Sequence, residues 1–285
     1  MECFQQKDQA LGSEVVLTLV TAGTTELFEL LWQKINEFER QFSRFLAQSE
    51  LSQFNHRAGE RVAISPTFVA LLKKVKQQAV ATNGLFNPFI LPALERAGYD
   101  YSWITGSPAL SGAKNVVPAE QLTVGEDWAH IPAGTALDLG GIGKGYLLDS
   151  LANLVTADFS GYWFSLGGDI LANGKDAVGL PWQIGIQSAR DLGKTITEVV
   201  IPNPGRLAVA TSGVTKRRGV KDGRPWHHLI DPRTGEPAET DVLTATVCAP
   251  SATEADVYAS CAVILGKEDG QRFLREKGIT EFYLQ

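Results

Sequence analysis

Two oxygen-bearing side chains in the C-terminal part of the chain have the spacing of a metal site. Asp256 and Ser260 lie four residues apart in ADVYAS, within a segment (252–266) that is expected to be helical. Residues four apart share one face of a helix, so this carboxylate and hydroxyl could share one hard cation. Mg²⁺ takes one or two protein carboxylates and completes its shell with water and substrate phosphates. The alternative is an acid placed near a helix N-terminus by the helix dipole alone.

A glycine-rich stretch, DLGGIGKGYLLD (138–149), suggests close approach to an anion. Glycine has no side chain to keep a ligand away from the backbone, and Lys144 adds positive charge. It is not a P-loop, which requires glycine at position 138 and Ser or Thr at 145, where this chain has Asp138 and Gly145. It is not a dinucleotide fingerprint, because Tyr146 takes the place of the third glycine. Taken alone, the loop could equally be a tight strand-to-helix connection.

Three further stretches carry groups suited to phosphate chemistry. SLGGDI (165–170) has a second Gly-Gly followed by an acid, and ATSG (210–213) places two hydroxyls at the expected end of a strand. HHLIDPRTGEPA (227–238) sets His228 ahead of Asp231. A basic run between the last two offers local positive charge, although a solvated loop is the plainer interpretation. Its members are Lys216, Arg217, Arg218, Lys221 and Arg224.

The elements that must position these groups follow from local patterns. Strands are expected at 14–20, 162–166, 182–187, 195–201, 206–211 and 243–249, separated by turn signals that favour an antiparallel or mixed sheet. Helices are expected from Thr24-Thr25, with apolar positions as far as Phe45, and from Ser65-Pro66 to Asn83-Gly84. Two more are expected over residues 144–157 and, as the last helix, 251–266. Because helices and strands are partly segregated, the fold class is α+β, with mixed or antiparallel sheets and packed helices.

Composition narrows the function classes. The 285 residues carry a net charge of −6, which argues against a general nucleic-acid surface. Three cysteines form no metal-binding spacing and, as an odd number, no disulfide framework. No apolar segment approaches the ~20 residues that a transmembrane helix needs. The N-terminus has no apolar run of a signal peptide or lipobox, so we expect a cytoplasmic protein unless an export signal precedes it.

Taken together and in this order, the motifs resemble those of the ApbE family, the FAD:protein FMN transferases. The resemblance extends to FSRFLAQSELSQFN (42–55), which is similar to the family's Phe-Ser-Thr-Tyr-Arg-Pro-x-Ser-Glu-Leu-Ser-x-x-Asn segment, and to GLFNPFILPAL (84–94), similar to Gly-x-Phe-Asp-Pro. It covers about residues 11–265. It implies a single domain over residues 1–285, built of two closely associated lobes with FAD in the cleft between them.

The resemblance also implies the reaction and its site. A Thr or Ser hydroxyl of an acceptor flavoprotein attacks the FMN-side phosphorus of FAD, and AMP leaves, with Mg²⁺ neutralising the pyrophosphate. The implied metal ligands are the Gly143 carbonyl, Asp256 and Ser260, and the implied catalytic residues are His228 and Asp231. His228 would accept the proton, with Asp231 orienting it or acting itself; alternatively, His228 only hydrogen-bonds flavin or backbone. Residues implied to bind FAD are Phe45, Leu85, Phe86, Asn87, Asp138, Gly140, Gly141, Lys144, Tyr146, Gly167, Gly168, Asp169, Thr211, Ser212, His228 and Ile230.

The chain departs from the family pattern at several of these positions. Gly143 and Ser260 replace a usual alanine and threonine, and both keep the oxygen that a metal would use. Phe45 replaces a tyrosine near the flavin ring and loses its hydroxyl, and Asn87 replaces an aspartate. Lys144 could contact phosphate or pair with Asp138 or Asp169 instead.

Two other functions remain open at the level of the sequence. With water as the acceptor, the same site would make an Mg²⁺-dependent FAD pyrophosphatase that yields FMN and AMP. A non-catalytic FAD-binding protein is the third reading, although flavin binding alone does not require the Asp256 and Ser260 pair. The sequence does not indicate the acceptor protein or the oligomeric state.

Overall fold

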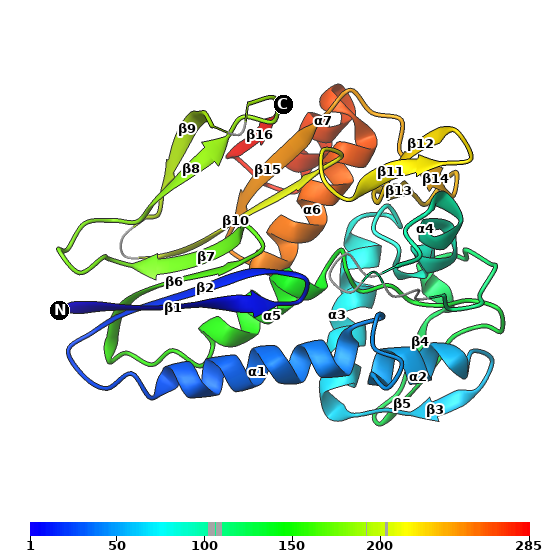
Figure 1. The fold of residues 1–285 in the computed structure, drawn as a ribbon, viewed down its shortest axis with the longest axis horizontal. Coiled ribbons are helices and arrows are strands. Elements are labelled where there is room, and N and C mark those ends of the chain that lie inside the picture. Colours follow the sequence, from blue (N-terminus) through cyan, green and yellow to red (C-terminus); the bar gives the residue numbers. More distant parts are fainter. Residues whose placement is uncertain (102–105, 107–109, 192, 203–204) are drawn as a thin grey trace.

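An antiparallel sheet of seven strands forms the larger part of the fold in a computed structural model that describes residues 1–101, 106, 110–191, 193–202 and 205–285 (Figure 1). Its order is β1-β2-β6-β7-β10-β15-β16, and each neighbouring pair is antiparallel. The strands are β1 (Glu2–Ala10), β2 (Ser13–Thr21), β6 (Phe159–Leu166), β7 (Asp169–Gly174), β10 (Arg206–Gly213), β15 (Thr244–Ala249) and β16 (Phe282–Leu284).

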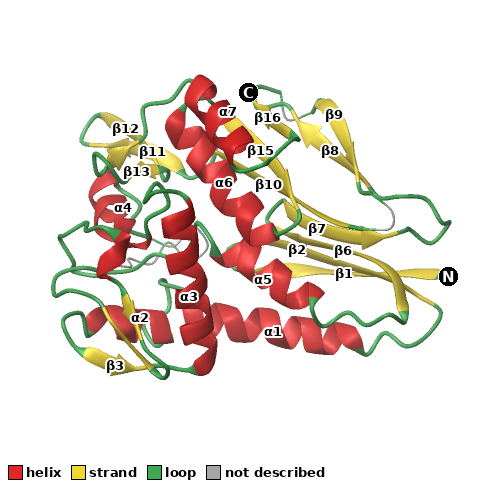
Figure 2. Cartoon of the chain, turned by 180° about the vertical axis from the view of Figure 1, so that it is seen from behind, coloured by secondary structure: helices red, strands yellow, loops and turns green. Residues whose placement is uncertain are grey.

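Helices cover one face of this sheet and a hairpin covers part of the other (Figures 1 and 2). On the helical face lie α1 (Leu27–Phe42), α5 (Gly143–Ala152) and α6 (Ala252–Leu265), with α7 (Lys267–Glu276) packed on α6. On the opposite face the hairpin β8 (Gln183–Gln187) and β9 (Thr195–Val200) packs Ile184, Ile186 and Val199 against Ala172 and Val209 of the sheet. Burial on both faces explains why the central strands are apolar on both sides.

The second part of the molecule lies beside the sheet, to the right in Figure 1, and is built from short elements. Its helices are α2 (Glu50–His56), α3 (Pro66–Ala81), the 3₁₀ turn η1 (Pro88–Ile90), α4 (Leu91–Ala97) and the 3₁₀ turn η2 (Ala119–Gln121). Its small sheets are β3 (Arg61–Ala63), β5 (Trp128–His130) and β4 (Thr123–Val124), then β11 (Arg218–Lys221) with β12 (Arg224–His227), and β13 (Ile230–Asp231) with β14 (Glu236–Pro237).

Local sequence signals set several boundaries as expected. The Ser65 side chain caps α3 by accepting from the Phe68 amide at 3.2 Å, and the helix stops where Asn83 and Gly84 take positive φ. Ser251 caps α6 in the same way, and Gly266, with φ of 80°, ends it. The expected strands are present, and the α+β class with antiparallel sheets is confirmed.

Four expectations about elements need correction. Strand β1 was not expected, because its residues are mostly exposed and polar and it is held at the sheet edge by backbone pairing with β2. Helix α1 ends at Phe42, where Ser43 turns to extended backbone, so Phe45 lies outside it. Helix α5 ends at Ala152 rather than near residue 157, since Leu154 and Val155 form only short turns. Helix α7 follows α6, which is therefore not the last helix.

The described part of the chain contains no helix with the length and apolar character needed to cross a membrane.

Candidate active site

Helices α5 and α6 are fixed against each other at the point where the glycine loop becomes a helix. A Cβ on Gly145 would lie 2.4 Å from the Ala252 carbonyl oxygen, so only glycine permits this approach. At the next turn of α5, Asp149 accepts from the Ser251 hydroxyl and from the amides of Ala252 and Thr253. The acid that closes the motif DLGGIGKGYLLD therefore caps α6 and sets the position of Asp256.

The acids and the lysine of three predicted motifs meet beside this helix pair. The Asp256 carboxylate, 3% exposed, accepts from the Gly145 amide at 3.1 Å. Asp169, at the start of β7 and 2% exposed, accepts from the Thr211 amide at 3.1 Å and forms an ion pair with Lys144. Lys144 Nζ also lies 3.9 Å from Asp256 Oδ1. Lys144 pairs with Asp169, one of the two acids named as alternatives to phosphate.

Hydroxyl groups line the neighbouring edge of the site at the end of β10. The Ser212 and Ser260 hydroxyls are 2.8 Å apart. The hydroxyls of Thr211 and Thr246, also 2.8 Å apart, lie on the other face of the sheet, because these residues alternate with those that face α6. Since Ser260 is one turn after Asp256 on α6, the structure brings the predicted carboxylate and hydroxyl together with Ser212 of the ATSG stretch. The sheet and the helix layer thus meet in a cluster of oxygen atoms.

This oxygen cluster fits a hard divalent cation. One Asp256 oxygen is used by the Gly145 amide, and the other faces Lys144 without a hydrogen bond to the backbone. Ser260 is half-buried, and a methyl at Gly143 would contact only Phe38 at 3.5 Å, so the usual family alanine would also fit. No group of three or more His, Cys, Asp or Glu ligands occurs among the described residues. A site here would therefore rely on one carboxylate, a hydroxyl, a carbonyl and non-protein ligands, as Mg²⁺ accepts.

The glycine loop has fewer free amides than an anion cradle would require. The Gly140 amide donates to Asp138 Oδ1 at 2.8 Å, and those of Ile142 and Gly143 donate to the Leu139 carbonyl. At the start of α5, the amides of Gly145 and Tyr146 also have acceptors within the protein. Phosphate binding at this loop stays a prediction, and it would depend on Gly141, Lys144 and side-chain charge.

The Gly-Gly of SLGGDI has a structural reason. Gly167 and Gly168 form the two-residue turn between β6 and β7, with φ of 63° and 98°. Two successive positive φ values are what a type I′ hairpin turn requires, and glycine adopts them without strain. The turn delivers Asp169 directly to Lys144.

The other end of the site is aromatic and contains an arginine that sequence reasoning missed. Arg44 is 6% exposed, forms an ion pair with Asp138 at 3.0 Å and donates to the Tyr99 carbonyl at 3.0 Å. Its guanidinium lies 4.2 Å from the centroid of the Phe45 ring and 4.6 Å from that of Tyr99. Among the described residues, Nη1 is buried without a hydrogen-bond partner. The sequence feature that could have indicated Arg44 is its position in FSRFLAQ, where the family segment has threonine before the aromatic residue.

The segment 85–87 contacts the glycine loop through Phe86. The side-chain oxygen of Asn87 accepts from the Phe89 backbone amide at 3.0 Å, and its side-chain NH₂ donates to the Val117 carbonyl at 2.9 Å. A carboxylate cannot make the second bond, which gives this departure from the family pattern a local reason. Phe86 is buried next to Gly141 of the loop, and Leu85 packs on the core; contact of either residue with FAD stays a prediction.

His228 lies between the two ends. Its ring contacts Tyr99 edge-on with centroids 6.4 Å apart, and its amide donates to the Arg217 carbonyl. Burial, the main cause, together with the charges of Arg217 and Lys144, lowers the pKa of His228 to about 3. The imidazole is therefore neutral at physiological pH and in the state that accepts a proton.

Two predicted residues have other partners. Both Asp231 oxygens accept from the Arg233 guanidinium at 2.7–3.1 Å, and this pairing holds the pKa of Asp231 below its usual value against the opposing effect of burial. Among the described hydrogen bonds none joins Asp231 to His228, so the structure does not support an orienting role. Ile230 is 1% exposed within an apolar cluster that includes Trp226 and Tyr99, and its contact with FAD stays a prediction.

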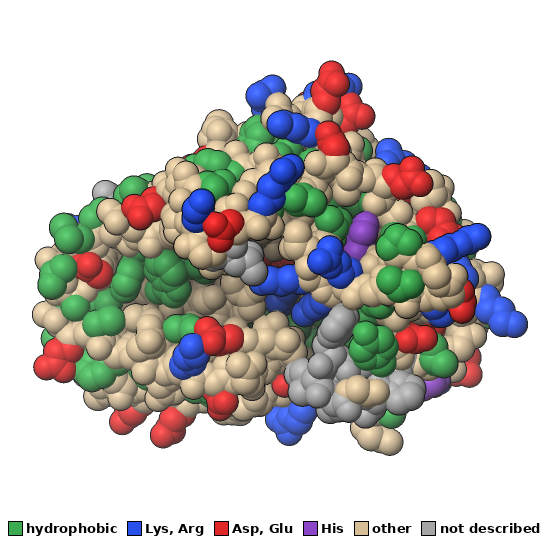
Figure 3. Space-filling model, turned by 45° about the horizontal axis from the view of Figure 1, so that its top comes forward, with side chains coloured by type: hydrophobic (Ala, Val, Ile, Leu, Met, Phe, Trp, Pro, Cys, Tyr) green, Lys and Arg blue, Asp and Glu red, His purple; other side chains and the backbone are tan. Residues whose placement is uncertain are grey.

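Tyr146 packs on Phe38, and part of the basic run lies near Lys144. Tyr146 stacks on Phe38 at 6.3 Å, and burial raises the pKa of its hydroxyl. Of the basic run, Arg217 and Lys216 lie close enough to Lys144 to lower its pKa in addition to the larger effect of burial, whereas Lys221 donates to the Glu95 carbonyl. Figure 3 shows Lys and Arg side chains gathered around the middle of one face, beside a histidine.

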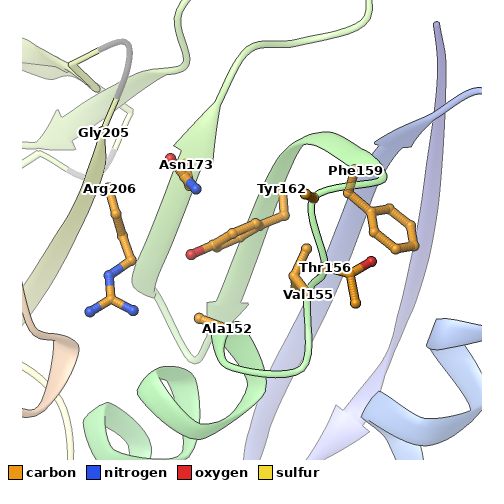
Figure 4. A pocket seen from close by; sticks show the side chains of 9 residues that line it. Ala152, Val155, Thr156, Phe159, Tyr162, Asn173, Gly205 and Arg206 are labelled. Carbon is orange, nitrogen blue, oxygen red and sulfur yellow. The ribbon is translucent and has the colours of Figure 1, made fainter.

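Two cavities lined by described residues lie away from the charged centre. One, of about 510 Å³, lies at the opposite ends of α5 and β10 and is lined by Tyr162, Asn173 and Arg206 (Figure 4). A smaller one of about 160 Å³ is lined by Arg44, Phe45 and Asn55 among others, and so borders the aromatic end. The Asn55 amide group is occupied by the backbone of Leu137, which it anchors just before the glycine loop.

Comparison with known proteins identifies the family and similar folds. The sequence model of the ApbE family matches residues 11–284. The FAD:protein FMN transferase of Treponema pallidum is 33% identical and covers 90% of this chain and 75% of its own, and that of Klebsiella pneumoniae is 29% identical over 86% and 73%. In fold, the chain is similar to the ApbE protein of Thermotoga maritima (TM-score 0.86, 24% identity, 99% and 94% covered). The Vibrio cholerae flavin transferase ApbE is also similar (TM-score 0.80, 24% identity, 99% and 93% covered).

Proposed function

Because this chain belongs to the ApbE family, we propose that it transfers FMN from FAD to a Thr or Ser hydroxyl of an acceptor flavoprotein and releases AMP. The family makes the chain a transferase that acts on flavin. The acceptor residue, the leaving group and the requirement for Mg²⁺ are the finer parts of the proposal.

The observation that carries these finer parts is the convergence of Asp256, Ser260 and Ser212 beside Lys144. Oxygen donors on α6 and β10 with one carboxylate suit Mg²⁺, which would be held by Asp256, Ser260 and the Gly143 carbonyl. When bound, the ion supplies charge neutralisation at the pyrophosphate and polarises the bond that breaks. A site for flavin alone would not need this group of oxygen atoms.

Other residues of this chain bind the flavin, add charge near the phosphates and accept the proton. Phe45 offers a ring face for the flavin, and Lys144 and Arg217 add positive charge near the phosphates. His228, neutral in the free protein, accepts the proton of the attacking hydroxyl. The oxygen of that hydroxyl bonds to the FMN phosphorus as the bond from this phosphorus to the AMP oxygen breaks, and AMP leaves with the electron pair. The anionic substrate would raise the basicity of His228 by offsetting the neighbouring cations.

Purified protein incubated with FAD and MgCl₂, with and without an acceptor flavoprotein, tests the proposal. We expect AMP release that depends on the acceptor and flavin fluorescence that stays with the acceptor band on a denaturing gel. AMP release at the same rate without acceptor would instead indicate an FAD pyrophosphatase. Binding of FAD with no AMP under either condition would indicate a non-catalytic binder.

A further inference from the structure

The two buried acids of the charged centre share one lysine. Asp169 and Asp256 each give one carboxylate oxygen to a backbone amide, that of Thr211 and of Gly145 respectively. The remaining oxygen of each carboxylate faces Lys144 Nζ, which is bonded to Asp169 and lies 3.9 Å from Asp256 Oδ1. Lys144 thus lies between Asp256, which is assigned to the metal, and Asp169, which is not among the implied metal ligands.

Because these three side chains are largely buried, their charges need partners within the protein. The side chains of Asp169 and Asp256 are 3% and 5% exposed, and that of Lys144 is 21% exposed. Isolated charges in such surroundings cost several kcal/mol each unless they are paired. Among the described residues Lys144 is the one cation that forms an ion pair with either acid. It therefore acts as the internal counter-ion of both.

We propose that Lys144 competes with the divalent cation for Asp256, and that Asp169 is the residue that holds the Lys144 ammonium once the cation has bound. The proposal rests on the proposed function for the position of the cation. A Mg²⁺ ion roughly 2 Å from Asp256 Oδ1 would lie within roughly 6 Å of the ammonium, where like charges repel strongly at low dielectric. The ion pair with Asp169, already present without the cation, keeps Lys144 in place when the cation takes the Asp256 oxygen. Asp169 is thus a positioning residue.

Titration of MgCl₂ into FAD-free protein by isothermal calorimetry tests this competition without reference to turnover. Lys144→Met removes the charge and keeps the length of the side chain, and Lys144→Arg keeps the charge. We expect Lys144→Met to bind Mg²⁺ at least about tenfold more tightly than the wild type, and Lys144→Arg to bind within about threefold of it. In EDTA, Lys144→Met melts at a lower temperature than the wild type, and MgCl₂ raises its melting temperature by more.

The double variant Lys144→Met/Asp256→Asn locates the ion. Loss of the tight binding in this double variant supports competition at Asp256, whereas its persistence would place the ion elsewhere and overturn the proposal. Equal or weaker Mg²⁺ binding by Lys144→Met than by the wild type overturns the competition and leaves the proposed function standing. No binding by either protein overturns both the competition and the metal part of the proposed function.

Discussion

The two ends of the site differ in whether their buried polar groups have partners within the protein. One end is where α5 meets α6, and the other is built around Arg44, Phe45 and Tyr99. At the first, the side chains of Lys144, Asp169 and Asp256 all have partners within the protein. At the second, Arg44 Nη1 and the neighbouring His228 Nδ1 are buried with none among the described residues. An unpaired buried donor or acceptor costs about 1–3 kcal/mol.

The difference indicates a division of roles. The α5–α6 end is organised before any substrate arrives, because its charges are compensated and its helices are locked by Gly145 and Asp149. The aromatic end keeps hydrogen-bonding capacity that a substrate would use. Of the departures from the family pattern, Phe45 lies at the aromatic end, whereas Gly143 and Ser260 lie at the charged end and keep the oxygen that a metal would use.

The largest expected effect is at the charged end. Asp256→Asn keeps an acceptor for the Gly145 amide but removes the charge that would hold Mg²⁺, so we expect AMP release from FAD to fall by at least about hundredfold. Glu254→Gln, which makes the same charge change two residues away on α6, is the matched control and retains activity. Similar rates for Asp256→Asn and the control, with both proteins folded by circular dichroism, would show that the acid does not act on a metal.

A pair of glycine variants tests whether the charged end is locked by packing. Gly145→Ala places a methyl 2.4 Å from the Ala252 carbonyl oxygen, and we expect a loss of about 1–3 kcal/mol in the free energy of unfolding. Gly143→Ala, whose methyl would meet only Phe38 at 3.5 Å, is expected to change it by less than about 0.5 kcal/mol. Urea denaturation measures both. Equal losses would mean that the close approach of α5 and α6 is not what makes Gly145 necessary.

The pH dependence of stability tests the aromatic end. The folded-state pKa of His228, about 3, is below its ordinary value of 6.5. The unfolded chain therefore takes up a proton between these values that the folded protein does not, and stability is lost as pH falls from 7. Replacing His228 by Asn removes this loss, so between pH 7 and pH 5 the variant should lose about 1–2 kcal/mol less than the wild type.

Exposed His56→Asn is the control for this experiment. Urea midpoints at the two pH values should leave this control parallel to the wild type. A His228→Asn curve that also runs parallel would show that His228 takes up a proton in the folded protein over this range, so that burial does not hold its imidazole neutral.

The smallest effect is expected at the hydroxyl of the charged end. Ser260→Thr keeps the oxygen that faces Ser212 and adds only a methyl group that restricts its rotamer, so AMP release should stay within about twofold of the wild type. Ser260→Ala, which removes the oxygen, should be clearly slower in the same assay. A tenfold drop in Ser260→Thr would mean that the space around the hydroxyl matters more than its oxygen.

Much of the fold was predictable because its signals are local. The caps Ser65 and Ser251 and the stops at Gly84 and Gly266 fix α3 and α6 from a few neighbouring residues. Two of the missed elements lack such signals, whereas α2 has one in its cap, Ser49. Strand β1 has no apolar alternation, and α7 contains Gly270, which reads as a break until its close contact with the Ala262 carbonyl is seen.

The candidate site divides in the same way. Motifs placed Lys144, Asp169, Ser212, Asp256 and Ser260 in one group, and the structure brings them together. The partners were not predictable, because they depend on contacts between segments far apart in the chain. Arg44 with Asp138 belongs to this class, as does the pairing of Asp231 with Arg233 in place of His228, which depends on how a short turn folds back.

The position of the divalent cation is the central claim, and anomalous scattering from a crystal grown with MnCl₂ and FAD tests it most directly. The account predicts one strong peak roughly 2–2.5 Å from an Asp256 oxygen, with the Ser260 hydroxyl and the Gly143 carbonyl also in the coordination shell. A peak bound by Asp169 instead of Asp256, or density for FAD with no peak at α6, would contradict it.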